Sequence, residues 1–434
     1  MKPFSDIPAF PTDSGSFAEA FYKDPIGCST DAYHRLGPVF SIQHEGKKML
    51  AMGGVEANRK VWRTRDLWDY ATSNEHFREQ FSKRYLNQLE GREYIEKRKR
   101  VQAGFKTKML MTHTATMGEV VIREIEKIAG EWIDLRSFCM KLIIAMTSRA
   151  LMQVDLPEGM DTTMAVSNKM MLRADTLGNW RHLYYLRPDR IYRRQKIFKY
   201  LGGIIDARKG IPPEEQGDDI LSLSLRAHPK EAPPIGRMEL IHDLSQLMMA
   251  GSTTTSHLVL WHFVMLAAHP EWNTELLEEL NSWNTQGFDD MGKFPKLKAS
   301  CLEIERLRPS SVFFNRLSKK AIDFEGYDIP SDTWVMHLHV LAHFLEDVYD
   351  APLNFRPQRF IENPDLPHRD VHGLYGGGSH VCVGSPFARI LTPTVLGNAL
   401  AHFNIEWKEA ADPRAQIETV LAPKTPALVK FSRK

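Results

Sequence analysis

One loop decides how this chain folds: Tyr375-Gly376-Gly377-Gly378-Ser379-His380-Val381-Cys382-Val383-Gly384, followed directly by Ser385-Pro386. Its glycines allow positive backbone dihedral angles and a close approach of the backbone to another group. Cys382 stands just before a predicted helix N-terminus, where backbone N–H groups and the helix dipole stabilise a thiolate. A thiolate is either a nucleophile or a metal ligand.

The residues alone leave several interpretations of this loop open. His380 is the nearest base for a nucleophilic Cys382, but a spacing of two residues in a loop is poor geometry for a Cys–His pair. A single thiolate ligand suits an iron whose other ligands come from a macrocycle. A buried, inert cysteine is the simplest alternative. A phosphate cradle is disfavoured, because neither Gly-Lys-Ser/Thr nor a third Rossmann glycine follows.

The chain around the loop has 434 residues and the composition of a globular protein. Its formal net charge of +2 is too small to attract nucleic acid or an anionic membrane to the molecule as a whole. Hydrophobic residues make up 43% and charged residues 25%, which excludes a disordered chain. The four cysteines form no CxxC pair and are too scattered for a disulfide framework, so we expect reduced thiols.

No segment has the pattern of a targeting signal or a membrane span. The N-terminal Met-Lys-Pro-Phe-Ser-Asp-Ile-Pro lacks the apolar stretch of a secretory signal. The longest apolar run, 258–268, contains His262 and falls well short of the ~18 residues that suggest a span. We therefore expect a cytoplasmic protein with no membrane anchor and no nucleic-acid partner.

The patterning predicts a mainly α chain with a small β region near both ends. Residues 38–42 and 48–52, separated by Glu45-Gly46, are typical of a hairpin, and 55–302 is mostly helical. Helix breaks are expected at Pro157-Glu158-Gly159, Gly210-Ile211-Pro212-Pro213 and Pro233-Pro234-Ile235-Gly236. Further strands are expected at 324–330, 333–336, 403–407 and 427–431, with a helix over 385–403. Because no linker divides the chain, we expect a single domain over residues 1–434.

One predicted helix is long enough to cross a whole domain. It begins after Gly236 and ends at His269-Pro270, which is roughly 32 residues or ~48 Å. Apolar residues lie nearly all round it, which indicates a buried helix. Its middle, Ala250-Gly251-Ser252-Thr253-Thr254-Thr255, consists of weak helix formers. Either Thr254 bonds back to the Ala250 carbonyl and opens the helix to admit a small ligand, or the helix is simply packed tightly at Gly251.

A charged motif, Glu303-Ile304-Glu305-Arg306, lies shortly before Pro309. Glu303 and Arg306 are three residues apart and can pair on one face of a helix. The simplest interpretation is a solvated ion pair of small energy. Alternatively, Arg359, which has apolar rings nearby in Phe355-Arg356-Pro357-Gln358-Arg359-Phe360, joins the pair in a buried network of bidentate bonds.

Together these three features resemble one family, the cytochromes P450. The heme-binding loop of that family, Phe-Gly-x-Gly-x-His-x-Cys-x-Gly and then Ala-Arg, is matched at 375–384 and at Ala388-Arg389, with Tyr375 in place of Phe. The Glu-x-x-Arg motif matches at Glu303 and Arg306, and the Pro-x-Arg-Phe motif at 357–360. The resemblance covers at least residues 91–384. It implies the cytochrome P450 fold, with heme b between the long helix and the loop.

The resemblance implies a role for each matched position. Cys382 is the axial thiolate of the heme iron, whose electron donation favours O–O cleavage, and Tyr375 lies beside it. Arg98, Arg316 and His380 are expected cations for the heme propionates, and Tyr94 is a hydroxyl donor. The other expected heme contacts are Ala250, Gly251, Gly376 and Gly384. Lys97-Arg98-Lys99-Arg100 also has the pattern of a solvated basic face, on which an acidic electron donor would dock.

The long helix departs from the family pattern at one position. The family usually places an acid and then a Thr after Ala-Gly-x, and this pair helps to deliver protons to dioxygen. Here Thr253 occupies the acid position and Thr254 keeps the alcohol, and both are expected catalytic residues. Protons then pass through waters, Thr254 or another carboxylate such as Asp243. Alternatively, the enzyme couples phenol or aryl radicals without inserting oxygen.

The resemblance implies a monooxygenase, of a kind found in secondary metabolism, that oxidises an apolar or aromatic small molecule with O2. No flavin-binding segment follows the loop, so electrons are expected from a separate ferredoxin or flavodoxin and its reductase. Substrate contacts are expected from 67–89, from 170–180, and from Met249, Ser252, Val312, Phe313 and Phe314. Phe313 and Phe314 are equally typical of ordinary core. A heme-binding sensor or electron carrier is the alternative from another class.

Three further histidines, His337, His339 and His343, invite a metal interpretation. His337 and His339 are expected on one face of a strand. No acidic or cysteine ligand accompanies them at ligand spacing, so a second metal site is not expected.

Overall fold

The computed structural model describes residues 2–11, 16–44, 47–111, 113–228, 234–284, 291–366, 370–417 and 420–434. The expected turn at Glu45-Gly46 and the expected break at Pro233 lie outside these residues. The chain divides into two compact units, each assembled from separate stretches. Unit 1 comprises Met1–Ser73, Pro295–Cys382 and Asp412–Thr425, and unit 2 comprises Asn74–Phe294, Val383–Ala411 and Pro426–Lys434.

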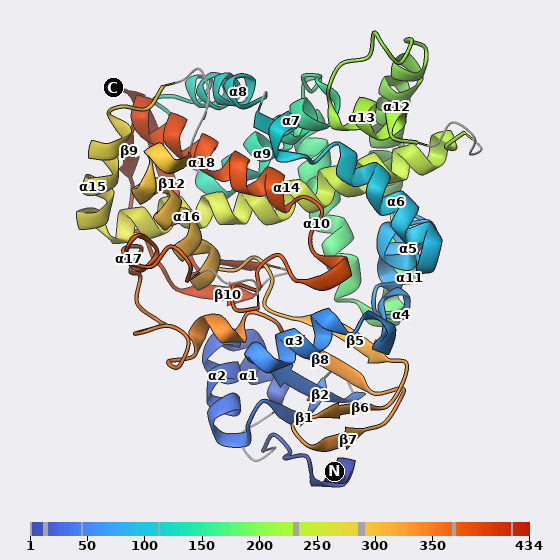
Figure 1. The fold of residues 1–434 in the computed structure, drawn as a ribbon. Coiled ribbons are helices and arrows are strands. Elements are labelled where there is room, and N and C mark those ends of the chain that lie inside the picture. Colours follow the sequence, from blue (N-terminus) through green and yellow to red (C-terminus); the bar gives the residue numbers. More distant parts are fainter. Residues whose placement is uncertain are drawn as a thin grey trace. The chain divides into compact units, whose positions relative to one another are not determined.

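Unit 1 is built on a five-stranded sheet with the order β1-β2-β8-β5-β3 (Figure 1). Its strands are β1 (Val39–His44), β2 (Lys47–Gly53), β3 (Trp68–Asp69), β5 (Phe314–Ser318) and β8 (Trp334–Leu338). β2 and β8 run parallel, and the other neighbouring pairs are antiparallel. The pairing of Val39 with Met52 confirms the predicted hairpin.

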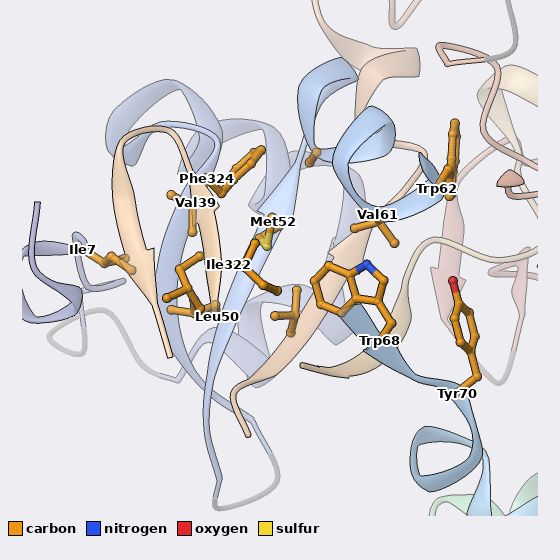
Figure 2. Close-up of a cluster of buried hydrophobic side chains, with 13 residues drawn as sticks. Ile7, Val39, Leu50, Met52, Val61, Trp62, Trp68, Tyr70, Ile322 and Phe324 are labelled. Carbon is orange, nitrogen blue, oxygen red and sulfur yellow. The ribbon is translucent and has the colours of Figure 1, made fainter. Parts of the chain in front are cut away.

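Both faces of this sheet are covered. Leu50 and Met52 of β2 join the buried cluster drawn in Figure 2, together with side chains of α3 (Val55–Arg63). Met49 and Ala51 join a second cluster with side chains of α1 (Phe17–Lys23) and α2 (Pro25–Leu36). Successive strand residues point to opposite faces. Two covered faces therefore explain why residues 49–52 are apolar without interruption.

Shorter elements complete unit 1. Its remaining helices are α4 (Tyr70–Ser73), α16 (Pro295–Leu307) and α17 (Arg359–Glu362). Two small hairpins pair β6 (Ile322–Phe324) with β7 (Tyr327–Ile329) and β10 (Ala415–Ile417) with β11 (Leu421–Pro423). Single 3-10 turns lie at Phe4–Asp6, Arg65–Leu67, Leu341–Phe344 and Gly378–His380.

A helix of 32 residues, α14 (Arg237–Ala268), forms the core of unit 2 and confirms the predicted long helix. It packs against α9 (Leu135–Met152), α12 (Pro188–Lys209) and α18 (Ser385–His402). Helical structure is continuous through Ala250 and Thr255, so the expected local opening is absent from this described stretch. None of the helices in the described residues is both long and apolar enough to cross a membrane.

The other helices of unit 2 surround this core. They are α5 (Glu75–Gln80), α6 (Gly91–Ala103), α7 (Thr107–Met111), α8 (Thr114–Glu126), α10 (Met160–Asp175), α11 (Arg181–Tyr185), α13 (Ile220–Arg226) and α15 (Pro270–Leu280). Single 3-10 turns lie at Leu86–Gln88, Gly178–Trp180 and Met291–Lys293. A small antiparallel sheet joins β4 (Ile133–Asp134), β12 (Leu428–Arg433) and β9 (Phe403–Trp407), which confirms the predicted strands of the tail. The expected mainly α fold with a small β region is confirmed.

Candidate functional site

The glycine loop of unit 1 packs directly on helix α3. A Cβ atom at Gly377 would overlap the indole of Trp62, and one at Gly378 would overlap the Trp62 carbonyl oxygen. Gly378 also has a φ of 64°, in the left-handed region. Trp62 lies at one edge of the cluster in Figure 2. The sequence indicated that another group lies close to the backbone of this loop. At Gly377 and Gly378, that group is Trp62 of the protein itself.

Cys382 is the exposed cysteine at the end of this loop. Its backbone N–H donates to the carbonyl oxygen of Tyr375 at 2.9 Å, which closes the loop. Cys139 and Cys301 are buried, and burial raises the pKa of both thiols. Burial also raises the pKa of Cys28 to about 11. Cys382 is thus the cysteine whose sulfur an external group can reach, and the interpretation as a buried, inert residue is wrong.

The side chain of Tyr375 is held by a carboxylate that the sequence interpretation missed. Its hydroxyl donates to Glu305 Oε1 at 2.7 Å, and His372 Nε2 lies 3.1 Å from Glu305 Oε2. Glu305 is 4% exposed and His372 is 6% exposed. Glu305 lies inside the Glu303-Ile304-Glu305-Arg306 motif, but its partners lie about 70 residues further along the chain, so no local pattern signals the contact.

Two expected heme contacts of unit 1, Arg316 and His380, meet at the ring of Tyr70. His380 stacks on this ring with centres 3.7 Å apart and planes 13° apart. The guanidinium carbon of Arg316 lies 4.5 Å from the same ring centre. Tyr70 is the first residue of α4 and is labelled in Figure 2. The sequence interpretation included it only within the broad segment 67–89 and gave it no role.

Arg316 is partly buried, and no carboxylate in the described residues pairs with it. Its Nη1 donates to the Asn315 carbonyl oxygen at 2.7 Å, while its buried Nε has no hydrogen-bond partner there. Burial lowers the pKa of this guanidinium. Buried cations require an anionic partner, and a heme propionate is such an anion. An exposed thiol and an unmatched cation in one unit therefore fit heme.

Unit 2 brings together the two heme contacts expected on α6. Arg98 Nη1 donates to the hydroxyl oxygen of Tyr94 at 3.1 Å, and Tyr94 is 1% exposed. The two residues are four apart, so they lie one above the other on the same helix face. Arg98 thereby holds the phenol and remains partly exposed itself.

The interpretation of residues 97–100 as a solvated basic face is wrong for two of the four side chains. Lys97 is 4% exposed and Arg100 is 7% exposed. Lys97 Nζ lies 2.6 Å from Asp243 Oδ1, and Arg100 Nη2 lies 3.1 Å from Asp243 Oδ2. Glu239 lies 3.5 Å and 3.2 Å from the same two cations. These ion pairs tie α6 to α14, so Asp243 is already engaged and is poorly suited to relay protons.

Thr253 and Thr254 lie side by side on α14 but in different hydrogen-bonding environments. Thr254 Oγ1 donates to the Ala250 carbonyl oxygen at 2.8 Å, which confirms the predicted back-bond. Thr253 is 4% exposed, and its hydroxyl has no hydrogen-bond partner within the described residues. The carbonyl oxygen of Thr253 accepts bonds from Ser256 Oγ at 3.0 Å and from His257 Nδ1 at 2.7 Å. Thr253 is thus a buried hydroxyl with unused bonding capacity.

Gly251 and Gly376, two of the glycines expected at the heme, are not required by packing within their own units. A Cβ at Gly251 would meet only a methyl group of Thr147, at an ordinary 3.7 Å. The alternative that Gly251 marks a tightly packed point of the helix is therefore wrong. Gly376 has a φ of 66° and open space around a Cβ, and Gly384 is the N-cap residue of α18. Ala250 is partly buried.

The expected substrate residues of unit 2 have separate surroundings. Met249 packs with Phe81 and Tyr85 in a small apolar cluster. Ser252 is fully buried, and its Oγ accepts from Asn168 Nδ2 at 3.0 Å and donates to the Met248 carbonyl oxygen at 2.5 Å. Ser252 therefore links α10 to α14, whereas Met249 belongs to an apolar surface shared with the segment after α5.

The expected substrate residues of unit 1 contact the protein core. Val312 and Phe313 pack against the cluster that covers α1, and Phe313 lies 5.5 Å from the ring centre of Phe21. Phe314 stacks on His339 with ring centres 4.3 Å apart. These contacts favour the core interpretation that the sequence left open for the two phenylalanines.

Glu303, Arg306 and Arg359 form the buried network that the sequence offered as an alternative. Arg306 Nε and Nη2 donate to the two oxygens of Glu303 at 2.8 and 2.9 Å, and Arg359 Nε lies 3.2 Å from Glu303 Oε2. Arg306 and Glu303 are fully buried. The interpretation as a solvated ion pair is therefore wrong, because neither side chain reaches water. Arg306 Nη1 also donates to the carbonyls of His343 and Pro352, which fixes α16 to the following loops.

Two of the three extra histidines are hydrogen-bonded to protein atoms, whereas neither ring nitrogen of His339 has a hydrogen-bond partner in the described residues. His337 Nε2 lies 2.8 Å from Asn58 Oδ1, and His343 bridges the Arg306 carbonyl oxygen and the Gly373 N–H. β8 ends at Leu338, so His339 lies just beyond the strand that holds His337. The described residues contain no group of three or more His, Cys, Asp or Glu arranged to hold a metal ion.

In unit 1, an exposed thiol at the end of a glycine loop and a cation without an acidic partner in the described residues fit a heme-thiolate class of site. Residues 23–431 match the family model for cytochrome P450. The chain belongs to the cytochrome P450 family and is thus a monooxygenase-type oxidoreductase that carries heme b.

Similar proteins agree with this assignment. Lanosterol 14-alpha demethylase of Bos taurus is 24% identical over 438 residues, which span 96% of this chain and 85% of that protein. Sterol 14alpha-demethylase of Mycolicibacterium vanbaalenii is 22% identical over 96% of this chain and 95% of its own length. Among solved structures, retinoic acid-bound cyanobacterial CYP120A1 matches with a TM-score of 0.84 at 20% identity, covering 99% of this chain and 100% of that one.

Proposed function

We propose that the Cys382 thiolate would hold the heme iron and that the enzyme uses O2 to oxidise an apolar or aromatic small molecule. The observation that carries this proposal is the exposed Cys382 at the end of the loop that packs on Trp62. Heme bound through a thiolate supplies the activation of dioxygen. The protein's part is to hold the group, to exclude competing ligands and to move protons. We also propose that the two units form one cytochrome P450 domain over residues 1–434.

The heme propionates are proposed to bind Arg316 and His380 from unit 1 and Arg98 and Tyr94 from unit 2. Arg316 supports this role because no carboxylate in the described residues pairs with it. The stack of His380 on Tyr70 limits the rotation of the imidazole, so less side-chain entropy is lost on binding. Tyr375, Gly376, Gly384, Ala250 and Gly251 are proposed to line the macrocycle.

Proton delivery is proposed to use Thr254 with help from Thr253. Thr254 donates its own proton to the Ala250 carbonyl oxygen, so its oxygen remains able to accept a bond from a water. Thr253 has a hydroxyl that can both donate and accept, and its burial makes an unused hydroxyl costly. The engagement of Asp243 by Lys97 and Arg100 supports a relay through hydroxyls and water.

An apolar polycyclic or isoprenoid molecule is the proposed substrate. The two relatives described above are named for sterol demethylation, and the structural neighbour is titled as bound to retinoic acid. Met249 with Phe81 and Tyr85 offers a surface of matching apolar character. Segments 67–89 and 170–180, with Ser252, are proposed to complete the substrate's surroundings. Electrons are proposed to come from a separate ferredoxin or flavodoxin and its reductase, in the cytoplasm.

Radical coupling is the second candidate, and Thr253 at the usual acid position favours it, because coupling needs no proton-driven oxygen insertion. Incubation with labelled dioxygen separates the two functions. Label in the product supports monooxygenation, whereas an unlabelled, coupled product supports radical coupling.

The ligand assignment is tested by the spectrum of the reduced protein with carbon monoxide. Wild type and C139A, which removes a buried thiol, are expected to give the same thiolate-type band. C382A is expected to lose that band. A thiolate-type band that persists in C382A, or a wild type that binds no heme, overturns the proposal.

A further inference from the structure

Glu305 of α16 is a buried acid that the proposed function does not use. It is two positions after Glu303, and an α-helix turns by ~100° per residue, so the two side chains point to nearly opposite sides of α16. Glu303 faces the two arginines of its network. Glu305 instead faces residues 372–375, which lie shortly before Cys382. Burying a carboxylate costs free energy unless hydrogen-bond donors satisfy it, so the residues on this side of α16 must supply them.

Both oxygens of the Glu305 carboxylate accept a hydrogen bond. The Tyr375 hydroxyl donates to Oε1 at 2.7 Å, and His372 Nε2 lies 3.1 Å from Oε2. An ionised carboxylate only accepts, so this nitrogen of His372 carries a proton. The other ring nitrogen of His372, Nδ1, is buried and has no hydrogen-bond partner within the described residues. The hydrogen bonding of the His372 ring is thus directed at Glu305.

A second histidine, His343, holds the ring of His372 in place. The two rings stack with centres 5.0 Å apart and planes 27° apart. Both nitrogens of His343 are engaged, because Nδ1 donates to the Arg306 carbonyl oxygen at 3.0 Å and Nε2 accepts from the Gly373 N–H at 2.9 Å. The protein's own contacts therefore orient His372 toward Glu305.

Tyr375 connects Glu305 to the cysteine at the end of the loop. Its hydroxyl is bonded to Glu305, while its carbonyl oxygen accepts the Cys382 N–H at 2.9 Å. Tyr375 is thus held both at the end of its side chain and at its backbone. The family pattern has Phe at this position, and a Phe could not make the bond to Glu305. This attachment of the loop to α16 therefore depends on the Tyr and the Glu of this particular chain.

We propose that Glu305 is a positioning residue for Cys382. Its hydrogen bond to Tyr375 restricts the motion of the peptide group that accepts the Cys382 N–H, and so keeps the sulfur in place as an iron ligand. The inference rests on the proposed binding of the heme iron by Cys382. A loop that moves more freely lets the sulfur leave the iron and take up a proton, so the thiolate-type band with carbon monoxide is lost sooner.

The test measures how long reduced, heme-loaded protein keeps its thiolate-type band with carbon monoxide. Y375F removes one oxygen atom and with it the bond to Glu305. It is expected to fold and to lose the band roughly tenfold faster than wild type, equivalent to about 1.4 kcal/mol. Y349F is the matched control, because Tyr349 is 1% exposed and its hydroxyl has no hydrogen-bond partner within the described residues. Y349F is expected to lose the band at the wild-type rate.

Two substitutions of similar length test Glu305 itself. E305Q keeps an oxygen that can accept from the Tyr375 hydroxyl, so it is expected to lose the band less than about threefold faster than wild type. E305M has no acceptor and is expected to lose the band at least as fast as Y375F. Adding Y375F to E305M is expected to cause no further acceleration, because the bond between the two residues is already gone. Two independent effects would instead multiply to roughly a hundredfold.

Unfolding is told apart from a displaced cysteine because an unfolded chain loses heme and every heme band, whereas a displaced sulfur changes the type of the band. The proposal is overturned if Y375F keeps the band as long as wild type, if Y349F loses it as fast as Y375F, if E305Q is as fast as E305M, or if the double variant multiplies the two effects. Y375F and Y349F decide the matter even where E305M fails to fold. A wild type without a thiolate-type band overturns the proposed role of Cys382, and this inference with it.

Discussion

The imidazole of His380 stacks on the ring of Tyr70, and Arg316 contacts the same ring. One tyrosine thus positions two side chains that are proposed to bind heme propionates. We expect Y70A to release heme faster than wild type, because both partners gain rotational freedom. Transfer of heme to an acceptor apoprotein measures the rate. Y22A, at a position 41% exposed, is the control. Equal rates for Y70A and wild type would show that the stack has no part in holding heme.

Two glycines of the loop have nearly the same backbone angles but different space. Gly376 and Gly378 have φ values of 66° and 64°. A Cβ at Gly376 meets nothing within 4 Å, whereas one at Gly378 overlaps the Trp62 carbonyl oxygen. We expect G376A to cost about 1 kcal/mol from backbone strain alone. G378A is expected to cost more and to lower heme content. Urea unfolding and heme content per chain test this difference, and equal costs would contradict it.

Loss of Arg306 leaves Glu303 as a buried and incompletely paired charge. We expect R306A to reduce the free energy of unfolding by about 3–5 kcal/mol. Arg356 in the same region is a partly exposed arginine paired with Asp350 and Glu362, so R356A is expected to cost less than about 1 kcal/mol. Urea titration of both variants gives the comparison. A cost for R306A no larger than that of R356A would show that the buried network is not a structural requirement.

Acid is expected to destabilise the protein through its buried histidines. Burial lowers the pKa of His337, His339 and His343, that of His339 to about 3. In the unfolded chain these rings titrate near 6.5, so the unfolded state takes up protons that the folded state does not. Stability that is present above pH 6.5 is therefore lost as the pH falls toward 3. The three rings together lower it by roughly 4 kcal/mol between pH 7 and 5.5.

Urea unfolding as a function of pH measures this loss. H339F removes one titrating ring and keeps the stack on Phe314. Its stability is expected to fall less steeply with decreasing pH, by about one proton per molecule. An unchanged slope would mean that His339 does not contribute.

Removal of the Thr254 hydroxyl is expected to uncouple the consumption of electrons from the formation of product. T254V keeps the shape of the side chain but no longer offers an oxygen to a water. We expect less product and more hydrogen peroxide per electron consumed, by roughly tenfold. T274V, on α15 where the hydroxyl bonds only to the Pro270 carbonyl among the described residues, is the control. A T254V variant with unchanged yield would indicate that protons reach dioxygen by another route.

Local patterns were enough to predict most elements and the ends of α14. The ends could be predicted because the helix-breaking residues Gly236 and His269-Pro270 flank the helix. Its burial could be predicted because apolar residues lie on nearly all of its sides. The exposed Cys382 and the Glu303–Arg306–Arg359 network also follow motifs written in short stretches. Tyr70 and Glu305 were missed for the opposite reason. Their partners lie far along the chain, and neither residue has an unusual neighbourhood in sequence.

The basic run at residues 97–100 shows a second limit of local patterns. Lys97 and Arg100 carry the charge of a surface segment, but Glu239 and Asp243, about 140 residues away, balance that charge in the interior. A charge pattern in one segment does not identify its counterions.

The unbroken helix α14 has a consequence for thermodynamic linkage. Ser252 and Thr254 are two positions apart on one continuous helix, and their side chains face different environments. Any ligand that shifts the helix on one side must alter binding on the other, and the coupling free energy is the same in both directions. A molecule bound beside Ser252 would therefore change the affinity for a molecule bound beside Thr254 by the same factor as the second molecule changes the affinity for the first.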